Sequence, residues 1–255
     1  MTPAEAAAIL AAGLAAGTIN TIVGSGSLIT FPTLLAVGYP PVLANVSNTI
    51  GLVTGSISGA IGYRKELEGQ AGRVRALGIA AVAGGLTGGI LLLTLPGSVF
   101  RNVVPVLILL ACVLVAVQPR LSRRADEREA AGVPRRHHGG PWLFVTIFST
   151  GIYGGYFGAA QGVLFIALLG IFLDDNLQRL NGLKNVLAAF VNGVAALLFI
   201  AFADVAWDAA GLLAAGAVVG GQVGARVGRR IPAGGLRVVI IVVGTVVALQ
   251  LLLSG

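Results

Sequence analysis

The chain alternates long apolar runs with short polar stretches. Eight runs can each cross a bilayer core of about 30 Å as a helix, given the helical rise and modest tilt. They cover about residues 4–23, 42–63, 76–95, 99–118, 142–157, 180–202, 209–226 and 237–254. Two shorter runs, about 27–38 and 162–173, would each extend only about 18 Å. This pattern predicts an all-α polytopic membrane protein.

The composition excludes an ordinary soluble protein. Hydrophobic residues make up 56% of the 255 residues, charged residues make up only 11%, and the mean hydropathy is +0.92. Soluble domains carry about a quarter charged residues, and their cores are not built from uncharged runs of about 20 residues. The single cysteine, Cys112, rules out an intrachain disulfide.

Basic residues are concentrated in three stretches. Fourteen of the seventeen Lys and Arg residues lie in 64–75, 119–141 and 226–237. Because cytoplasmic loops carry the excess of Lys and Arg, we expect a multi-pass plasma-membrane protein with these loops in the cytoplasm and both termini outside it. Anionic membrane lipids are sufficient partners for the loops, so no nucleic-acid partner is expected. The N-terminus contains Glu5 and no basic residue, so the first run is not expected to be a cleaved signal peptide.

The positions of the basic stretches divide the chain into three parts. We predict a first transmembrane repeat at 1–118, a basic cytoplasmic linker at 119–141 and a second transmembrane repeat at 142–255. Between the linker and the basic stretch at 226–237 the chain must cross the membrane an even number of times. The short run at 162–173 must therefore contribute a net crossing, which gives each half five crossings.

The two halves also share residues in register. Gly17, Gly24 and Phe31 recur 134 positions later as Gly151, Gly158 and Phe165, and Asn48 recurs 137 positions later as Asn185. Gly84, Gly85, Gly88, Pro96 and Arg101 recur 136 positions later as Gly220, Gly221, Gly224, Pro232 and Arg237. The chain is therefore predicted to be an internal duplication.

An odd number of crossings requires tandem copies to insert in opposite senses. The charges agree, because 64–75 is basic whereas its counterpart at 203–208 is acidic and carries Trp207 at an expected aromatic belt. The sequence thus predicts two inverted repeats of about five helical segments each, with one short interrupted helix per repeat. Many secondary transporters have this architecture, with the substrate near the midplane.

Each short run follows a glycine-rich interruption, at 24–27 in the first copy and at 158–162 in the second. Such breaks should lie inside the membrane, where non-helical backbone is tolerated only in a protein interior or beside a wet cavity. A helix that restarts there exposes N–H groups and the positive end of its dipole, so two such ends would form an anion site. Close packing is the alternative role for these glycines. Packing alone explains two series at four-residue spacing, Gly51, Gly55 and Gly59, and Gly216, Gly220, Gly224 and Gly228.

The predicted substrate-binding residues lie in the breaks, just before the first of them, and near the starts of the long helices that follow. They are Asn20, Gly24, Ser25, Gly26, Ser27, Asn48, Thr49, Gln161, Gly162, Lys184 and Asn185. Lys184 is a cation within a span, so either it pairs with the anion or it extends its amine to the membrane interface. Neither alternative is excluded by the sequence.

Other ionisable residues have simpler expected roles. Asp174, Asp175 and Arg179 are expected to form an interfacial cluster, with proton coupling by either Asp as the alternative. His137 and His138 are the only histidines, and no Cys or carboxylate is placed to complete a metal site with them. No metal, cofactor or catalytic residue is therefore expected.

Three segments carry a family resemblance. Residues 24–32 read Gly-Ser-Gly-Ser-Leu-Ile-Thr-Phe-Pro, followed by Gly-Tyr-Pro-Pro at 38–41 and Ala-Asn-Val-Ser-Asn-Thr at 44–49. They resemble the signature of the sulfite exporter TauE/SafE family of membrane anion permeases, and Leu-Asn-Gly-Leu-Lys-Asn at 180–185 looks like the matching element of the second half. The likeness covers essentially the whole chain. It implies transport of small anions, commonly sulfite, sulfonates or other organosulfur acids, often by export.

The chain departs from that family pattern inside the breaks. Ser25 and Ser27 stand where the family has glycine, and Ala159, Ala160 and Gln161 interrupt the second glycine run. Because these positions would line the site, the specific anion is left open. The direction of transport, the coupling ion and the oligomeric state are also left open, with a homodimer compatible with the sequence.

The leading hypothesis is a secondary transporter of a small anion that works by alternating access, with export as the direction that the resemblance implies. The alternative is a passive anion channel, which would lack a gradient-dependent turnover limit. A scaffold role does not call for duplicated breaks. An intramembrane enzyme is not expected, because no span contains a histidine and Cys112 has no residue placed to activate it.

Overall fold

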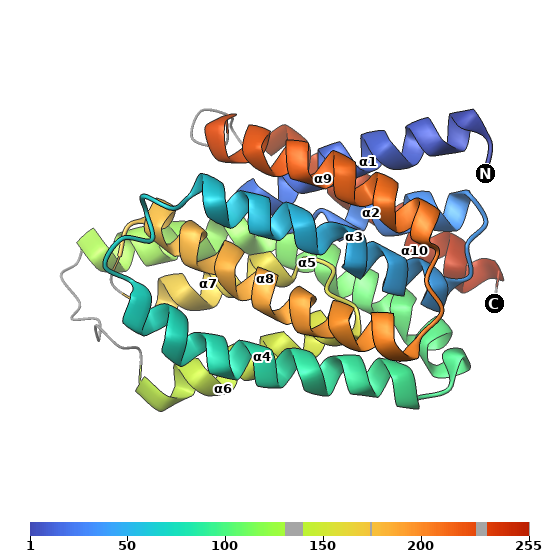
Figure 1. Ribbon diagram of the computed structural model, residues 1–255. Helices are drawn as coiled ribbons and strands as arrows, with labels where there is room; N and C mark the ends of the chain where they lie inside the picture. The colour runs from blue at the N-terminus through green and yellow to red at the C-terminus, as the bar shows by residue number, and fades with distance from the viewer. Residues whose placement is uncertain (131–139, 174, 228–233, 255) are drawn as a thin grey trace.

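The structure, a computed structural model, describes residues 1–130, 140–173, 175–227 and 234–254. Within these residues the chain forms ten helices (Figure 1). They are α1 (Pro3–Ile22), α2 (Ser27–Ala36), α3 (Pro41–Gly62), α4 (Ala71–Thr94), α5 (Gly97–Ala130), α6 (Gly140–Tyr156), α7 (Gln161–Phe172), α8 (Leu177–Phe202), α9 (Trp207–Val227) and α10 (Gly234–Ser254). In the described part, α1, α4, α8, α9 and residues 97–117 of α5 are long and apolar enough to cross a membrane. The all-α membrane fold is confirmed.

The main departure from the predicted boundaries lies in α5. Its apolar run was expected to end at 118, but the helix continues to Ala130. The added residues begin with Pro119, but most of those at 120–130 are Arg, Ala or Glu, which favour the helix, so their charge does not end it. His137, His138, Asp174 and Gly228 lie outside the described residues.

The helices pack in pairs that repeat between the halves. The two helices α3 and α8 contact each other, α9 packs against α1 and α3, and α4 packs against α6 and α8. Likewise α5 packs against α10 and α7, while α10 also packs against α2. Exchanging each helix for its counterpart five places along, so that α1 becomes α6 and α9 becomes α4, leaves these pairs unchanged. A duplicated unit would produce this pattern; the inverted repeat itself stays a prediction.

The glycine series lie at helix crossings. In α9, Gly216, Gly220 and Gly224 face the backbone of α1, while Gly51 and Gly55 of α3 face α9. A Cβ at Gly224 would come within 2.7 Å of the carbonyl oxygen of Thr18, so the helices could not approach as closely with a larger residue. The predicted packing role of the described members of both series is confirmed.

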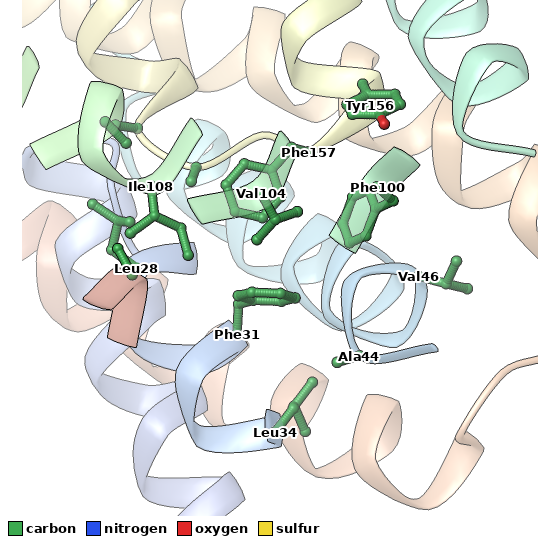
Figure 2. Packing of buried hydrophobic residues seen from close by; sticks show 14 of the residues in the cluster. Leu28, Phe31, Leu34, Ala44, Val46, Phe100, Val104, Ile108, Tyr156 and Phe157 are labelled. Atoms are coloured by element: carbon green, nitrogen blue, oxygen red, sulfur yellow. The ribbon is translucent and has the colours of Figure 1, made fainter. Parts of the chain in front are cut away.

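Aromatic packing ties the first short helix to the second break. Phe31 of α2 meets Phe157, which follows α6, edge to face with ring centroids 5.3 Å apart. Phe100 of α5 approaches the same Phe157 ring at 6.0 Å. Figure 2 shows the three rings side by side in the largest hydrophobic cluster. The short helix α2 in the first half of the chain thus packs against the break in the second half.

The ends of the helices separate into two groups. Figure 1 shows both chain termini at one end of the bundle, and the start of α4, the start of α6 and the end of α9 at the opposite end. The three basic stretches therefore adjoin the end that lies away from the termini. Which end faces the cytoplasm stays a prediction.

Candidate functional site

The first helix break lies between α1 and α2. The N–H groups of Val23 and Gly24 both donate to the carbonyl oxygen of Ile19, at 2.7 and 3.0 Å. Gly24 has φ +91°, a left-handed conformation that glycine adopts without a Cβ penalty. The Asn20 side chain spans the break, because its Oδ1 accepts from the N–H of Gly26 at 2.6 Å.

The second break repeats this geometry between α6 and α7. The N–H groups of Phe157 and Gly158 both donate to the carbonyl oxygen of Tyr153, each at 3.0 Å, and Gly158 has φ +75°. Here Gln161 reaches back from α7, and its Oε1 lies against Gly154. Both interruptions predicted from the sequence are confirmed, and one amide side chain spans each of them.

The two breaks touch each other. The N–H of Gly162 donates to the carbonyl oxygen of Gly24 at 3.1 Å, and a Cβ on either glycine would collide with the backbone of the other. Fewer N–H groups at the starts of α2 and α7 are therefore unpaired than expected. The carbonyl oxygen of Gly24 accepts from the N–H of Gly162, and the Oδ1 of Asn20 accepts from the N–H of Gly26. The physical reason is burial, because an N–H group removed from water needs an acceptor.

A small polar cavity lies between the breaks. Its volume of about 20 Å³ leaves room for about one water molecule. It is lined by Asn20, Gly24, Ser27, Ser56, Gly158, Gln161, Gly162, Lys184, Asn185, Ala188 and Asn192. Seven of the predicted site residues are among these, namely Asn20, Gly24, Ser27, Gln161, Gly162, Lys184 and Asn185. Their role in binding stays a prediction.

Four predicted residues do not line the cavity. Gly26 donates its N–H to Asn20 as described, and the Thr49 hydroxyl donates to the carbonyl oxygen of Asn45 within its own helix. Ser25 and Asn48 are buried, and the Ser25 Oγ and the Asn48 Oδ1 have no hydrogen-bond partner in the described part of the chain. The structure therefore separates these four from the residues that meet at the cavity.

Four lining residues are not among the predicted site residues: Gly158, which the sequence placed in the second break, and three others. Ala188 and Asn192 lie four and eight positions after Lys184, and Ser56 lies eight positions after Asn48. Positions four and eight apart share one helix face. Extending the helical period from the two predicted residues would have found all three.

The side chain of Lys184, which belongs to α8, contacts the C-terminal end of α1. Its side chain is 1% exposed, and its Nζ donates to the carbonyl oxygens of Asn20 and Thr21, at 2.9 and 3.1 Å. The side-chain amides of Asn181 and Asn185 also donate to Thr21 O, at 3.1 and 3.5 Å. The C-terminal carbonyls of a helix carry partial negative charge, which suits an ammonium. This burial excludes the alternative in which Lys184 extends to the membrane interface.

The first half contains a contact that corresponds to the one made by Asn181, but the residue that corresponds to Lys184 is uncharged. The side-chain amide of Asn45 donates to the carbonyl oxygen of Tyr156 at 3.0 Å, as Asn181 does at the end of α1. Asn181 lies 136 positions after Asn45, and the same offset places Asn48 opposite Lys184. Among the buried residues that the structure describes, Lys184 is the only one with a charged side chain. Within the described residues, the cavity therefore has one cation and no buried carboxylate beside it.

A cluster of charges lies at the turn between α7 and α8. The Asp175 carboxylate accepts from Arg73 at 2.6 Å and from Arg179 at 2.8 Å. Burial raises the pKa of the Asp175 carboxyl, but the hydrogen bonds from Arg179 and Arg73 outweigh it and hold the pKa below its ordinary value. The cluster with Arg179 was expected; Arg73 completes it.

The opposite end of the bundle has a smaller polar contact. Tyr39, between α2 and α3, donates its hydroxyl to the Asp208 carboxylate, with oxygen distances of 3.1 and 3.2 Å. Burial and the hydrogen bond to Asp208 raise the pKa of Tyr39. Within the described residues, no three His, Cys, Asp or Glu side chains gather as metal ligands would.

A membrane-embedded helical bundle with a polar cavity at paired helix breaks is the arrangement of a membrane transporter. The chain belongs to the sulfite exporter TauE/SafE family, whose pattern it matches over residues 9–251.

Curated relatives agree with this class. The chain is 27% identical over 242 residues to the probable membrane transporter protein YfcA of Escherichia coli strain K12, covering 93% of this chain and 86% of that protein. It is 26% identical over 220 residues to a probable membrane transporter protein of Haemophilus influenzae, covering 86% and 84% of the two chains. It is 24% identical over 246 residues to the probable membrane transporter protein ORF9 of a Sinorhizobium species, covering 96% and 91%. No solved structure matches the chain.

Proposed function

We propose that the protein is a secondary transporter of a small anion, which binds in the cavity between the two helix breaks. The observation that carries the proposal is that Lys184 and Gln161 both line that cavity. The ammonium is buried without a carboxylate, and both polar atoms of the Gln161 amide are buried without a partner among the described residues. A buried charge and a buried amide are costly without a partner. An anion would balance the charge of the ammonium and accept a hydrogen bond from the Nε2 of Gln161.

The charge balance narrows the class of anion. One ammonium, partly compensated by the carbonyls of Asn20 and Thr21, neutralises one negative charge at most. The other polar groups of the cavity are neutral, namely Asn20, Ser27, Ser56, Gln161, Asn185 and Asn192. A dianion would leave an uncompensated buried charge, which is costly. The site therefore suits a monoanion such as hydrogensulfite or a small sulfonate, in keeping with the family to which the chain belongs.

The cavity favours a carrier over a channel. A volume of about 20 Å³ is too small for a sulfonate, so the cavity must widen to load its substrate. The exchange symmetry of the helix pairs supports alternating access, in which two inverted halves rock around a central site. Export is the direction that the family description suggests.

Uptake of labelled sulfite and small sulfonates into proteoliposomes tests this function. We expect Lys184→Met and Gln161→Leu each to lower the rate by at least about tenfold, because each removes one hydrogen-bonding partner of a buried anion. Lys65→Met is the matched control, since Lys65 is the chain's only other lysine and is exposed. Normal transport of every candidate by both site variants would show that the assigned site is wrong.

A further inference from the structure

Two polar contacts occupy matching positions in the two halves. Tyr39 follows α2 and contacts Asp208 in the first turn of α9. Asp175 follows α7 and contacts Arg73 in the first turn of α4. Asp175 lies 136 positions after Tyr39, the offset that relates Asn45 to Asn181, and α9 is the counterpart of α4. In both halves, the turn that follows the short helix is therefore held by a polar contact. In the first half the carboxylate belongs to the long helix α9, whereas in the second half it belongs to the turn itself.

The contacts lie at opposite ends of the bundle. Figure 1 shows the α2–α3 turn and the start of α9 near the chain termini, and the start of α4 at the far end. The cavity with Lys184 lies between them along α8, since Lys184 is nine residues from Asp175, or about 14 Å of helix. Each contact is thus placed between the cavity and one end of the molecule.

Further hydrogen bonds extend both contacts inward. At the end with Asp175, the Gln70 side chain donates to the carbonyl oxygen of Arg179 at 3.1 Å, and Asn181 donates to the Tyr63 hydroxyl at 3.0 Å. These bonds join the α3–α4 loop to the start of α8 in steps toward the cavity. At the other end, the N–H of Ala206 donates to the Ser47 hydroxyl at 2.9 Å.

We propose that Asp175 with Arg73 and Arg179 closes one access route to the cavity, that Tyr39 with Asp208 closes the other, and that transport opens them in turn. This rests on the proposed function in taking the cavity as the transport site. Both contacts are formed in this structure, which agrees with a cavity too small for a substrate.

The two closures differ in strength. The Asp175 carboxylate has two guanidinium partners, and the side chains of Arg73 and Asp175 are only 18% and 14% exposed. A carboxylate that is partly shielded from water and held by two cations is bound more strongly than an exposed carboxylate that accepts from one neutral hydroxyl. The end with Tyr39 and Asp208 should therefore open first when the carrier is empty.

Thiol labelling of the cavity tests the assignment. The background is Cys112→Ala with Ser56→Cys as the reporter, in sealed vesicles of each orientation, and the probe is sulfonatoethyl methanethiosulfonate, which does not cross the bilayer. We expect Asp175→Asn to raise labelling about fivefold from the face that carries the basic stretches, and Tyr39→Phe to raise it less, from the other face. Asp175→Glu, which keeps the carboxylate, should restore slow labelling.

Asp204→Asn is the matched control, because Asp204 makes no side-chain hydrogen bond or ion pair in the described part of the chain; its labelling should match the background. Labelling that is unchanged in both gate variants, or that rises from the same face in both or from both faces at once, would overturn the proposal. The readout is access and needs no transported substrate. If the expected labelling pattern is found but no anion is transported, the substrate assignment is refuted, while the proposal that the two contacts close the access routes still stands.

Discussion

The Nζ of Lys184 lies 2.9 Å from the carbonyl oxygen of Asn20, in the last turn of α1. A cation of the second half thus caps a helix of the first half, next to the break that Asn20 spans. Because both residues also line the cavity, the only buried charge in the described residues joins a helix end to the proposed site.

Charge selectivity follows from this single cation. We expect monoanionic sulfonates to compete with the labelled substrate at least about tenfold better than dianions of similar size, since a second buried charge has no counter-charge. Competition assays in proteoliposomes measure the ratio. Equal competition by monoanions and dianions would contradict the charge balance proposed for the cavity.

The contact between the breaks predicts a large effect of Gly24→Ala. A methyl group there meets the backbone of Gly162 and also occupies a left-handed conformation, φ +91°, which alone costs about 1–2 kcal/mol. Gly38→Ala is the control, because Gly38 has φ +102° with nothing within 4 Å of a Cβ. Thermal unfolding in detergent should show a clearly lower Tm for Gly24→Ala than for Gly38→Ala. Equal decreases in Tm would show that the contact between Gly24 and Gly162 adds no steric cost.

The cluster at Asp175 predicts a dependence of stability on acid. Its pKa is lowered in the folded protein, so the contact stabilises the fold fully above the unfolded pKa of about 3.9. This contribution is lost as the pH falls through the lower folded pKa. As the pH is lowered from 5 to 3, past the unfolded pKa, the Tm of the wild type should fall more steeply than that of Asp175→Asn. Parallel curves would show that the ion pairs add no stability.

Topology is the next prediction. Both termini lie at the end of the bundle away from the basic stretches, and basic loops face the cytoplasm. A reporter fused to the C-terminus should therefore be extracytoplasmic, and one inserted in the α3–α4 loop should be cytoplasmic. A cytoplasmic signal from the C-terminus would overturn the count of five crossings per half.

Local signals predicted the helices and the breaks well. The apolar runs marked the elements, and Gly24 and Gly158 marked both interruptions because each takes a left-handed conformation that favours glycine. The apolar run of α5 was expected at about 99–118 and the membrane-crossing part covers 97–117, while the helix continues to Ala130 because charged residues can extend a helix beyond an apolar run.

Long-range contacts were beyond the sequence. Lys184 binds carbonyl oxygens 163 and 164 positions away, and every residue has a carbonyl, so no side-chain pattern marks the partner. The pairing of Gly162 with Gly24 is hidden for the same reason. The cavity was nonetheless partly predicted, because polar residues within apolar runs are costly and so draw attention to a site.

An experimental density map of the protein with a small sulfonate bound would test the central claim most directly. We expect ligand density between the breaks, with sulfonate oxygens within hydrogen-bonding distance of the Lys184 Nζ and the Gln161 amide. Density only at other positions, or unbroken helices through 23–26 and 157–160, would contradict the account.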